Sequence, residues 1–150
     1  MNFNNNTYQT EARFKCDSNE LVNIREFVIS QALYIGLNED EAFKVSLAVD
    51  EACSNLVKHG KKRTSIENNC YIYLDVYSNQ NQFIVEIHDK SESFNPNSVP
   101  SPDMQEYFKQ FKHGGLGIHI MRSLIDDISY IPATNENAYN TLQLKKAIIK

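Results

Sequence analysis

A chain of 150 residues has the size of one domain with a single core, and no linker-like stretch divides it. Hydrophobic residues make up 41% and charged residues 23%, which argues against a disordered chain, and the net charge of −4 argues against the basic face that nucleic-acid binding needs. No apolar run is long enough to cross a membrane, and the start has no secretory signal. We therefore expect a cytoplasmic protein whose residues 1–150 form one globular domain.

The cysteines and histidines show no spacing typical of a metal or redox site. Cys16, Cys53 and Cys70 are odd in number and form no CxxC pair, so we interpret them as small buried hydrophobic residues. The four histidines lack HExxH and zinc-finger spacing. No metal cage built from protein side chains alone is predicted.

The first part of the chain predicts an edge strand and two helices. Residues 7–15 alternate as a strand does. Asp17 starts a helix with apolar residues at helical spacing, and Gly36 ends it. Asn38 starts a second amphipathic helix, which we expect to end at Gly60.

A β-hairpin is predicted next, because the hydrophobic period changes from helical to two. Residues 70–77 alternate strictly, residues 78–81 supply a turn, and Phe83, Val85 and Ile87 continue on one face of the returning strand. The same alternation places Asp89 on that buried face, where a carboxylate without partners is costly.

The remaining elements complete the predicted fold. A long loop over residues 90–113 is typical of a lid or binding loop, a helix opens at Gly114, and strands are expected at 128–131 and 141–149. The order β-α-α-β-β-lid-α-β-β predicts an α+β fold, a two-layer sandwich with a mixed, mainly antiparallel sheet and helices on one face.

Two polar residues of the second helix form the first candidate site. Glu51 and Asn55 lie one turn apart, on the face we expect to be opposite the apolar stripe. An amide oxygen suits Mg²⁺, and a carboxylate one turn away can take a proton from a hydroxyl group. The alternative is an ordinary solvated helix face.

The glycine turn and Asp89 are the other candidates. Gly114-Gly115-Leu116-Gly117 lets backbone amides approach phosphates at the start of a helix, or it is an ordinary tight turn. Asp89 binds a ligand at the end of its strand, or it caps the following loop.

Together these segments resemble the GHKL (histidine kinase-like) ATPase superfamily, and within it the anti-sigma factor serine kinases. Residues 48–59 are similar to the N box, Asp89 with Phe94-Asn95-Pro96 to the G1 box, residues 114–121 to the G2 box, and residues 140–146 to the closing strand. The resemblance implies a Bergerat-type ATP-binding fold that uses ATP and Mg²⁺.

The resemblance also implies a role for each matching residue. Glu51 is the general base and Asn55 holds Mg²⁺. Asp89 accepts a hydrogen bond from the adenine amino group and Thr141 supports that aspartate. The nucleotide is further contacted by a set from the G1 and G2 boxes, namely Ser91, Phe94, Gly114, Gly115, Leu116 and Gly117.

The G1 box departs from the family pattern at one position. The glycine expected two residues after the aspartate is Ser91, which would weaken ATP binding if the backbone needs a positive φ there.

Three functions are compatible with these observations. The first is a kinase that phosphorylates a small anti-anti-sigma (STAS-like) antagonist and sequesters a sigma factor, the second a catalytically weak ATP-dependent binding module, and the third a nucleotide-free interaction domain. A histidine kinase is disfavoured because no phospho-acceptor segment precedes the domain, and the sequence leaves open whether the protein forms the homodimer common among such relatives.

Overall fold

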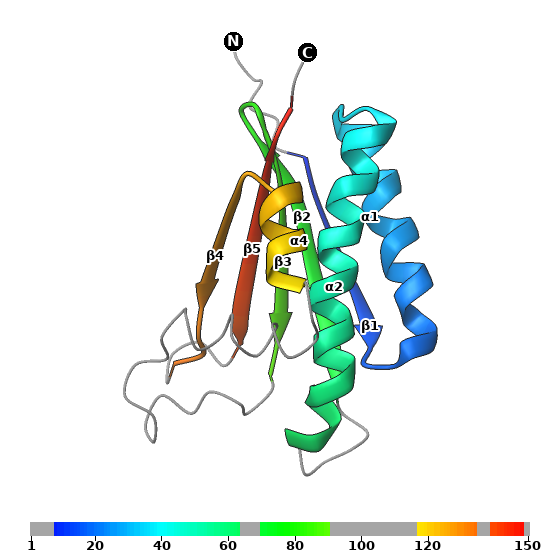
Figure 1. Cartoon of the computed structure of the whole chain (residues 1–150), viewed down its shortest axis with the longest axis vertical. Helices are drawn as coiled ribbons and strands as arrows, with labels where there is room; N and C mark the ends of the chain where they lie inside the picture. Colours follow the sequence, from blue (N-terminus) through cyan, green and yellow to red (C-terminus); the bar gives the residue numbers. More distant parts are fainter. Residues whose placement is uncertain (1–7, 64–69, 91–116, 135–138, 149–150) are drawn as a thin grey trace.

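The computed structural model describes residues 8–63, 70–90, 117–134 and 139–148, which form a sheet with helices packed on one face (Figure 1). The described strands are ordered β1-β2-β3-β5-β4. They are β1 (Gln9–Lys15), β2 (Tyr71–Asn79), β3 (Gln82–Asp89), β4 (Asp127–Ile131) and β5 (Asn140–Ala147), and the helices are α1 (Leu21–Ile35), α2 (Glu39–Arg63) and α4 (Gly117–Leu124). The predicted α+β sandwich is confirmed. Every described strand pairing is antiparallel, so the sheet is not mixed within this part of the chain.

The helix α1 begins later than the sequence suggested. Asp17 caps a short 3-10 turn, η2 (Ser18–Glu20), by accepting a hydrogen bond from the Asn19 amide, and α1 continues directly from that turn. Gly36 ends α1 as expected, because its φ of 131° is readily adopted only by glycine.

The helix α2 has the predicted start and a later end. Asn38 Oδ1 accepts a hydrogen bond from the Glu41 amide at 2.8 Å, which is an N-cap contact. The helix then runs to Arg63 and passes through Gly60, which we expected to end it. A glycine inside a helix costs only about 1 kcal/mol relative to alanine, so it does not force a helix to stop.

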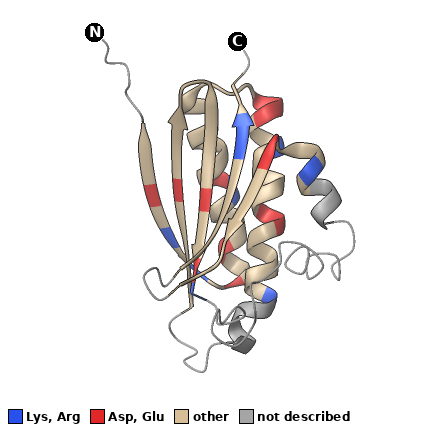
Figure 2. Ribbon diagram, turned by 90° about the vertical axis from the view of Figure 1, so that its left-hand side faces the viewer, with Lys and Arg blue, Asp and Glu red and all other residues tan. Residues whose placement is uncertain are grey.

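The hairpin is confirmed, and it divides side chains cleanly between the two faces of the sheet. β2 and β3 pair in register around a turn in which Gln80 has a φ of 58°. Phe83, Val85 and Ile87 are buried beneath the helices, and Asp89 follows them on the same face with 8% of its surface exposed. The alternate residues of each strand lie on the face that no described helix covers, which Figure 2 shows in front of the helices.

Two of the three cysteines do not behave as predicted. Cys16 and Cys70 form a disulfide, and only Cys53 is a free buried thiol. The reason is strand pairing. Lys15 pairs with Tyr71 at the end of the β1–β2 ladder, so the next residues, Cys16 and Cys70, meet each other, and the Cys16 amide donates to the Cys70 carbonyl at 3.1 Å.

None of the described helices combines the length and the apolar character needed to cross a bilayer.

Candidate functional site

Glu51 and Asn55 lie together on α2, as their spacing predicted. Asn55 Nδ2 lies 3.1 Å from the Glu51 carbonyl oxygen and 3.4 Å from Glu51 Oε2. Both residues are partly buried, so they sit at the margin of the apolar stripe rather than on a fully exposed face. Within the described residues Asn55 Oδ1 accepts no hydrogen bond, which leaves this oxygen available to a ligand.

A neighbouring carboxylate on α2 is occupied by a structural contact. Asp50 Oδ1 lies 2.7 Å from Arg25 Nη1, which joins α2 to α1. Glu51, by contrast, has no described ion pair. Of the two adjacent acids, Glu51 is therefore the one free to act on a ligand.

Asp89 is a buried carboxylate at the end of β3, and its described side-chain partner, Asn140, was not among the predicted site residues. Asn140 Nδ2, at the start of β5, donates to Asp89 Oδ1 at 3.2 Å. Asn140 Oδ1 in turn accepts from the Ala133 amide at 2.9 Å. Asn140 is thus held in place on both sides, and it orients the carboxylate.

The contact expected between Thr141 and Asp89 is absent among the described residues. Thr141 Oγ1 instead lies 2.8 Å from His88 Nδ1. Pairing explains this, because Asp89 is opposite Asn140 and His88 is opposite Thr141 in the β3–β5 ladder. Successive residues of a strand point to opposite faces, so Thr141 lies on the uncovered face of the sheet. The alternation of buried Leu142 and Leu144 was the signal that could have identified Asn140.

Asp89 also lies close enough to α2 to affect the electrostatics of that helix. Burial raises the pKa of the Cys53 thiol, and the negative charges of Asp50 and Asp89 raise it further. Because Cys53 falls between Glu51 and Asn55 on α2, the end of β3 and this part of α2 form one neighbourhood. Two of the three predicted segments are therefore brought together.

The third segment is described only in part. Gly117 is the first residue of α4, which packs against α2. In Figure 1 the first turn of α4, the C-terminal half of α2 and the end of β3 point toward the same end of the molecule. The other predicted ligand residues, Ser91, Phe94, Gly114, Gly115 and Leu116, lie outside the described residues.

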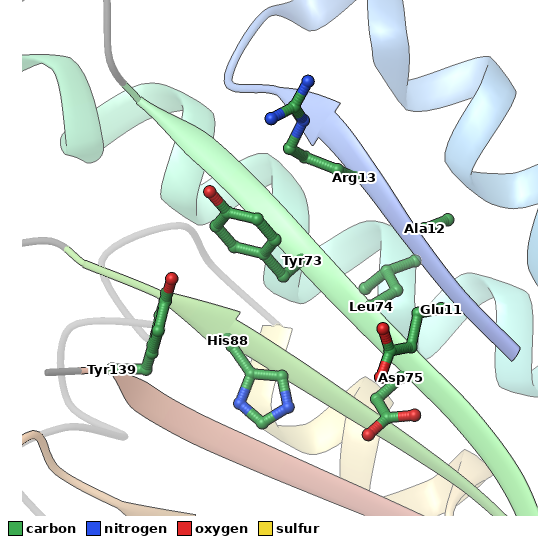
Figure 3. Close-up of a pocket in the computed structure, with 8 residues that line it drawn as sticks. All are labelled: Glu11, Ala12, Arg13, Tyr73, Leu74, Asp75, His88 and Tyr139. Atoms are coloured by element: carbon green, nitrogen blue, oxygen red, sulfur yellow. The ribbon is translucent and has the colours of Figure 1, made fainter. Parts of the chain in front are cut away.

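A cavity of about 560 Å³ lies elsewhere, on the uncovered face of the sheet (Figure 3). Its polar lining includes Arg13, Tyr73, Asp75, His88 and Tyr139. None of the predicted nucleotide residues lines it, so it is separate from the site built on α2 and β3.

Comparison with known proteins identifies relatives over most of the chain. The family model of the histidine kinase-like ATPase domain matches residues 14–146. Proteins named serine-protein kinase RsbW from Staphylococcus aureus strains JH9 and Newman are each 25% identical over 119 residues. These alignments cover 77% of this chain and 74% of each relative.

Proposed function

The chain belongs to the histidine kinase-like ATPase domain family, and from this premise we propose that it binds ATP with Mg²⁺ and phosphorylates serine or threonine on a protein partner. The observation that carries the proposal is that Glu51 and Asn55 lie together on α2, that the buried Asp89 lies close enough to influence Cys53 between them, and that α4 packs against the same helix. We further propose that residues 1–150 act as one ATP-binding domain.

Asn55 and Glu51 on α2 suit the Mg²⁺ ion that accompanies the phosphates of ATP. Asn55 Oδ1 lacks a described partner, while its amide nitrogen is fixed by Glu51. An amide oxygen held in this way suits Mg²⁺, which favours oxygen ligands and usually retains several waters.

The buried carboxylate of Asp89 suits the adenine base of ATP. Asp89 is 8% exposed, and the amide of Asn140 holds one of its oxygens. A fixed carboxylate accepts a hydrogen bond from an amino group, and adenine carries one at its Watson–Crick edge. Asp89 would therefore select adenine, supported by Asn140 rather than by Thr141. Gly117 and the preceding glycine turn would place helix N–H groups beside the phosphates.

The proposed reaction is a direct phosphoryl transfer. When bound, ATP supplies the γ-phosphoryl group, which bonds to the acceptor hydroxyl oxygen as its bond to the β-phosphate oxygen breaks and ADP leaves. Glu51 accepts the proton of that hydroxyl. Asn55 orients the Glu51 carboxylate, because Asn55 Nδ2 lies 3.4 Å from Glu51 Oε2. Positioning by the protein is the main source of catalysis in such reactions.

The partners are proposed from the resemblance and the similarity to serine-protein kinases. The acceptor would be a small anti-anti-sigma antagonist. When that antagonist is phosphorylated, this protein would sequester a sigma factor in the cytoplasm. A homodimer is part of the same proposal, and no direct contact with nucleic acid is included because the net charge is −4.

A second candidate function rests on Ser91 in place of the G1-box glycine. If this residue weakens nucleotide binding, the protein is a catalytically weak ATP-dependent binding module of a partner-switching system. Incubation with Mg-ATP and a candidate antagonist, followed by mass measurement of the antagonist, separates the two functions. A mass increase of one phosphate supports the kinase, and an unmodified antagonist that binds only with ATP supports the module.

Nucleotide binding itself is tested with Asn55→Ala. We expect the variant to keep the fold and to lose the thermal stabilisation that Mg-ATP gives to the wild type. Asn23→Ala is a matched control, because Asn23 also donates to an acidic side chain one turn earlier, Glu20, at 3.3 Å, but lies on α1. A wild-type response to Mg-ATP in Asn55→Ala would refute the metal role.

A further inference from the structure

The uncovered face of the sheet carries three carboxylates in a row. Glu11 on β1 pairs with Asp75 on β2, and Asp75 pairs with Glu86 on β3. The row crosses three neighbouring strands, where Figure 2 shows acidic residues at similar heights. Like charges directly opposite each other destabilise a sheet, so this arrangement calls for a compensating positive charge.

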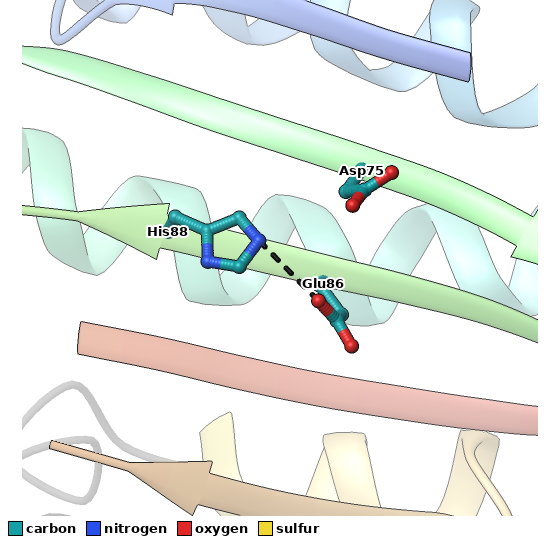
Figure 4. Close-up of side chains that lie close together, drawn as sticks. All are labelled: Asp75, Glu86 and His88. Atoms are coloured by element: carbon teal, nitrogen blue, oxygen red, sulfur yellow. Dashed lines mark ion pairs between the residues drawn. The ribbon is translucent and has the colours of Figure 1, made fainter. Parts of the chain in front are cut away.

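The described side chains supply little positive charge to offset these carboxylates. Among the described residues no lysine or arginine forms an ion pair with Asp75 or Glu86. The nearest cationic candidate is His88, whose Nε2 lies 3.4 Å from Glu86 Oε1 (Figure 4). One ligand-type atom from each of Asp75, Glu86 and His88 lies within 4.8 Å of the others, and all three residues are partly buried.

The imidazole is oriented as it is in metal sites. His88 Nδ1 contacts Thr141 Oγ1 at 2.8 Å, while Nε2 is directed toward Glu86. With the proton on Nδ1 and donated to the threonine oxygen, Nε2 offers its lone pair to the centre of the cluster. A metal-binding histidine usually donates its second N–H to a hydrogen-bond acceptor, and the Thr141 oxygen can serve as that acceptor.

Hydrogen bonds from neighbouring side chains also fix the carboxylates of Glu86 and Asp75. Glu86 Oε2 accepts from Tyr77 Oη at 2.7 Å and from Gln143 Nε2 at 2.8 Å, which leaves Oε1 for the cluster. Gln9 Nε2 lies 2.9 and 3.2 Å from the two oxygens of Asp75.

We propose that Asp75, Glu86 and His88 bind a divalent transition-metal ion, and that zinc binds more tightly than manganese or magnesium. One imidazole nitrogen with two carboxylate oxygens is a ligand set that zinc accepts, whereas magnesium prefers oxygen alone. Ligand atoms of a tetrahedral zinc lie about 3.4 Å apart. The His88–Glu86 distance of 3.4 Å meets this already, and Asp75 offers an oxygen within 4.8 Å of both ligand atoms.

The site has room for a further ligand and is distinct from the nucleotide site. Asp75 and His88 both line the 560 Å³ cavity of Figure 3, so a fourth coordination position opens to water there. Asp89 lies on the opposite, helix-covered face. Linear spacing could not indicate this cluster, because its members come from two strands and meet only through pairing.

The test uses the full chain, treated with a chelator and kept free of nucleotide. Titration with ZnCl₂ by calorimetry is expected to show one zinc per chain, with weaker binding of MnCl₂ and none of MgCl₂ at the same concentrations. His88→Gln and Asp75→Asn are each expected to lower zinc affinity by about 100-fold or more, because loss of an outer partner alone costs 10–100-fold. Glu86→Gln gives an independent third variant if either of these fails to fold, as judged by circular dichroism.

Two controls locate the ion. Asp127→Asn removes an exposed acid from β4, and Asn55→Ala removes the proposed magnesium ligand on α2. Both should bind zinc as the wild type does. The proposal is overturned if the wild type takes up no zinc, if magnesium binds as well as zinc, or if folded His88→Gln and Asp75→Asn variants retain wild-type affinity.

Discussion

Breaking the disulfide between Cys16 and Cys70 tests how the edge strand is held to the sheet. Among the strands that the structure describes, β1 pairs only with β2, and the bond joins the ends of these two strands across a sequence separation of 54 residues that includes α1 and α2. In the chain-entropy treatment, a closed loop of this size restricts the unfolded chain by about 4 kcal/mol at 25 °C. For a domain of this length that corresponds to a loss of about 8–16 °C in melting temperature on reduction.

The assay is thermal unfolding followed by circular dichroism with and without a phosphine reductant. Reductant should lower the melting temperature of the wild type and leave the Cys16→Ser/Cys70→Ser double variant unchanged. Cys53→Ala is the matched control, because it removes the buried free thiol and should keep the response to reductant. Titration of thiols in the denatured, unreduced wild type should find one. Three thiols, or a melting temperature that reductant does not change, would refute the reasoning.

Three further predictions concern the proposed nucleotide site and one ion pair. Glu51→Gln should keep ATP affinity and lose phosphotransfer, whereas Asp89→Asn should lose binding; equal loss of binding in both, by calorimetry, contradicts these roles. Ser91→Gly should tighten Mg-ATP binding about fivefold if serine costs about 1 kcal/mol there, and unchanged affinity means that the serine is tolerated. Lys146, at 2.8 Å, holds the pKa of Glu41 below its usual value. The stability that this contact gives is therefore present above about pH 4.5 and lost as pH falls through the lowered pKa, so denaturant unfolding of wild type and Glu41→Gln should converge in acid.

Periodicity was sufficient to predict most of the fold. The buried residues Ile24, Val28 and Ala32 of α1 and the strict alternation along β2 are local signals, and both elements formed where these signals lie. The burial of Asp89 followed from the same alternation on β3. These predictions succeeded because a one-residue slip would turn an apolar face to water.

Contacts that depend on strand register were not predictable in the same way. The Cys16–Cys70 bond and the Asn140–Asp89 hydrogen bond both require knowing which residues face each other across a ladder. The end of α2 was misplaced for a different reason, since a glycine penalty of about 1 kcal/mol is small against the packing of a 25-residue helix. Local pattern fixes which face a residue occupies, whereas its partner is set by the fold.

The two proposed ligand sites adjoin each other at two consecutive residue pairs of the β3–β5 ladder. His88 and Thr141 turn toward the uncovered face, and the adjacent Asp89 and Asn140 turn toward the helices. A metal bound by His88 would therefore lie one residue along the strand from Asp89, although the two sites share no side chain. Any effect of one ligand on the affinity of the other would pass through these peptide units, and thermodynamic linkage makes such an effect equal in both directions.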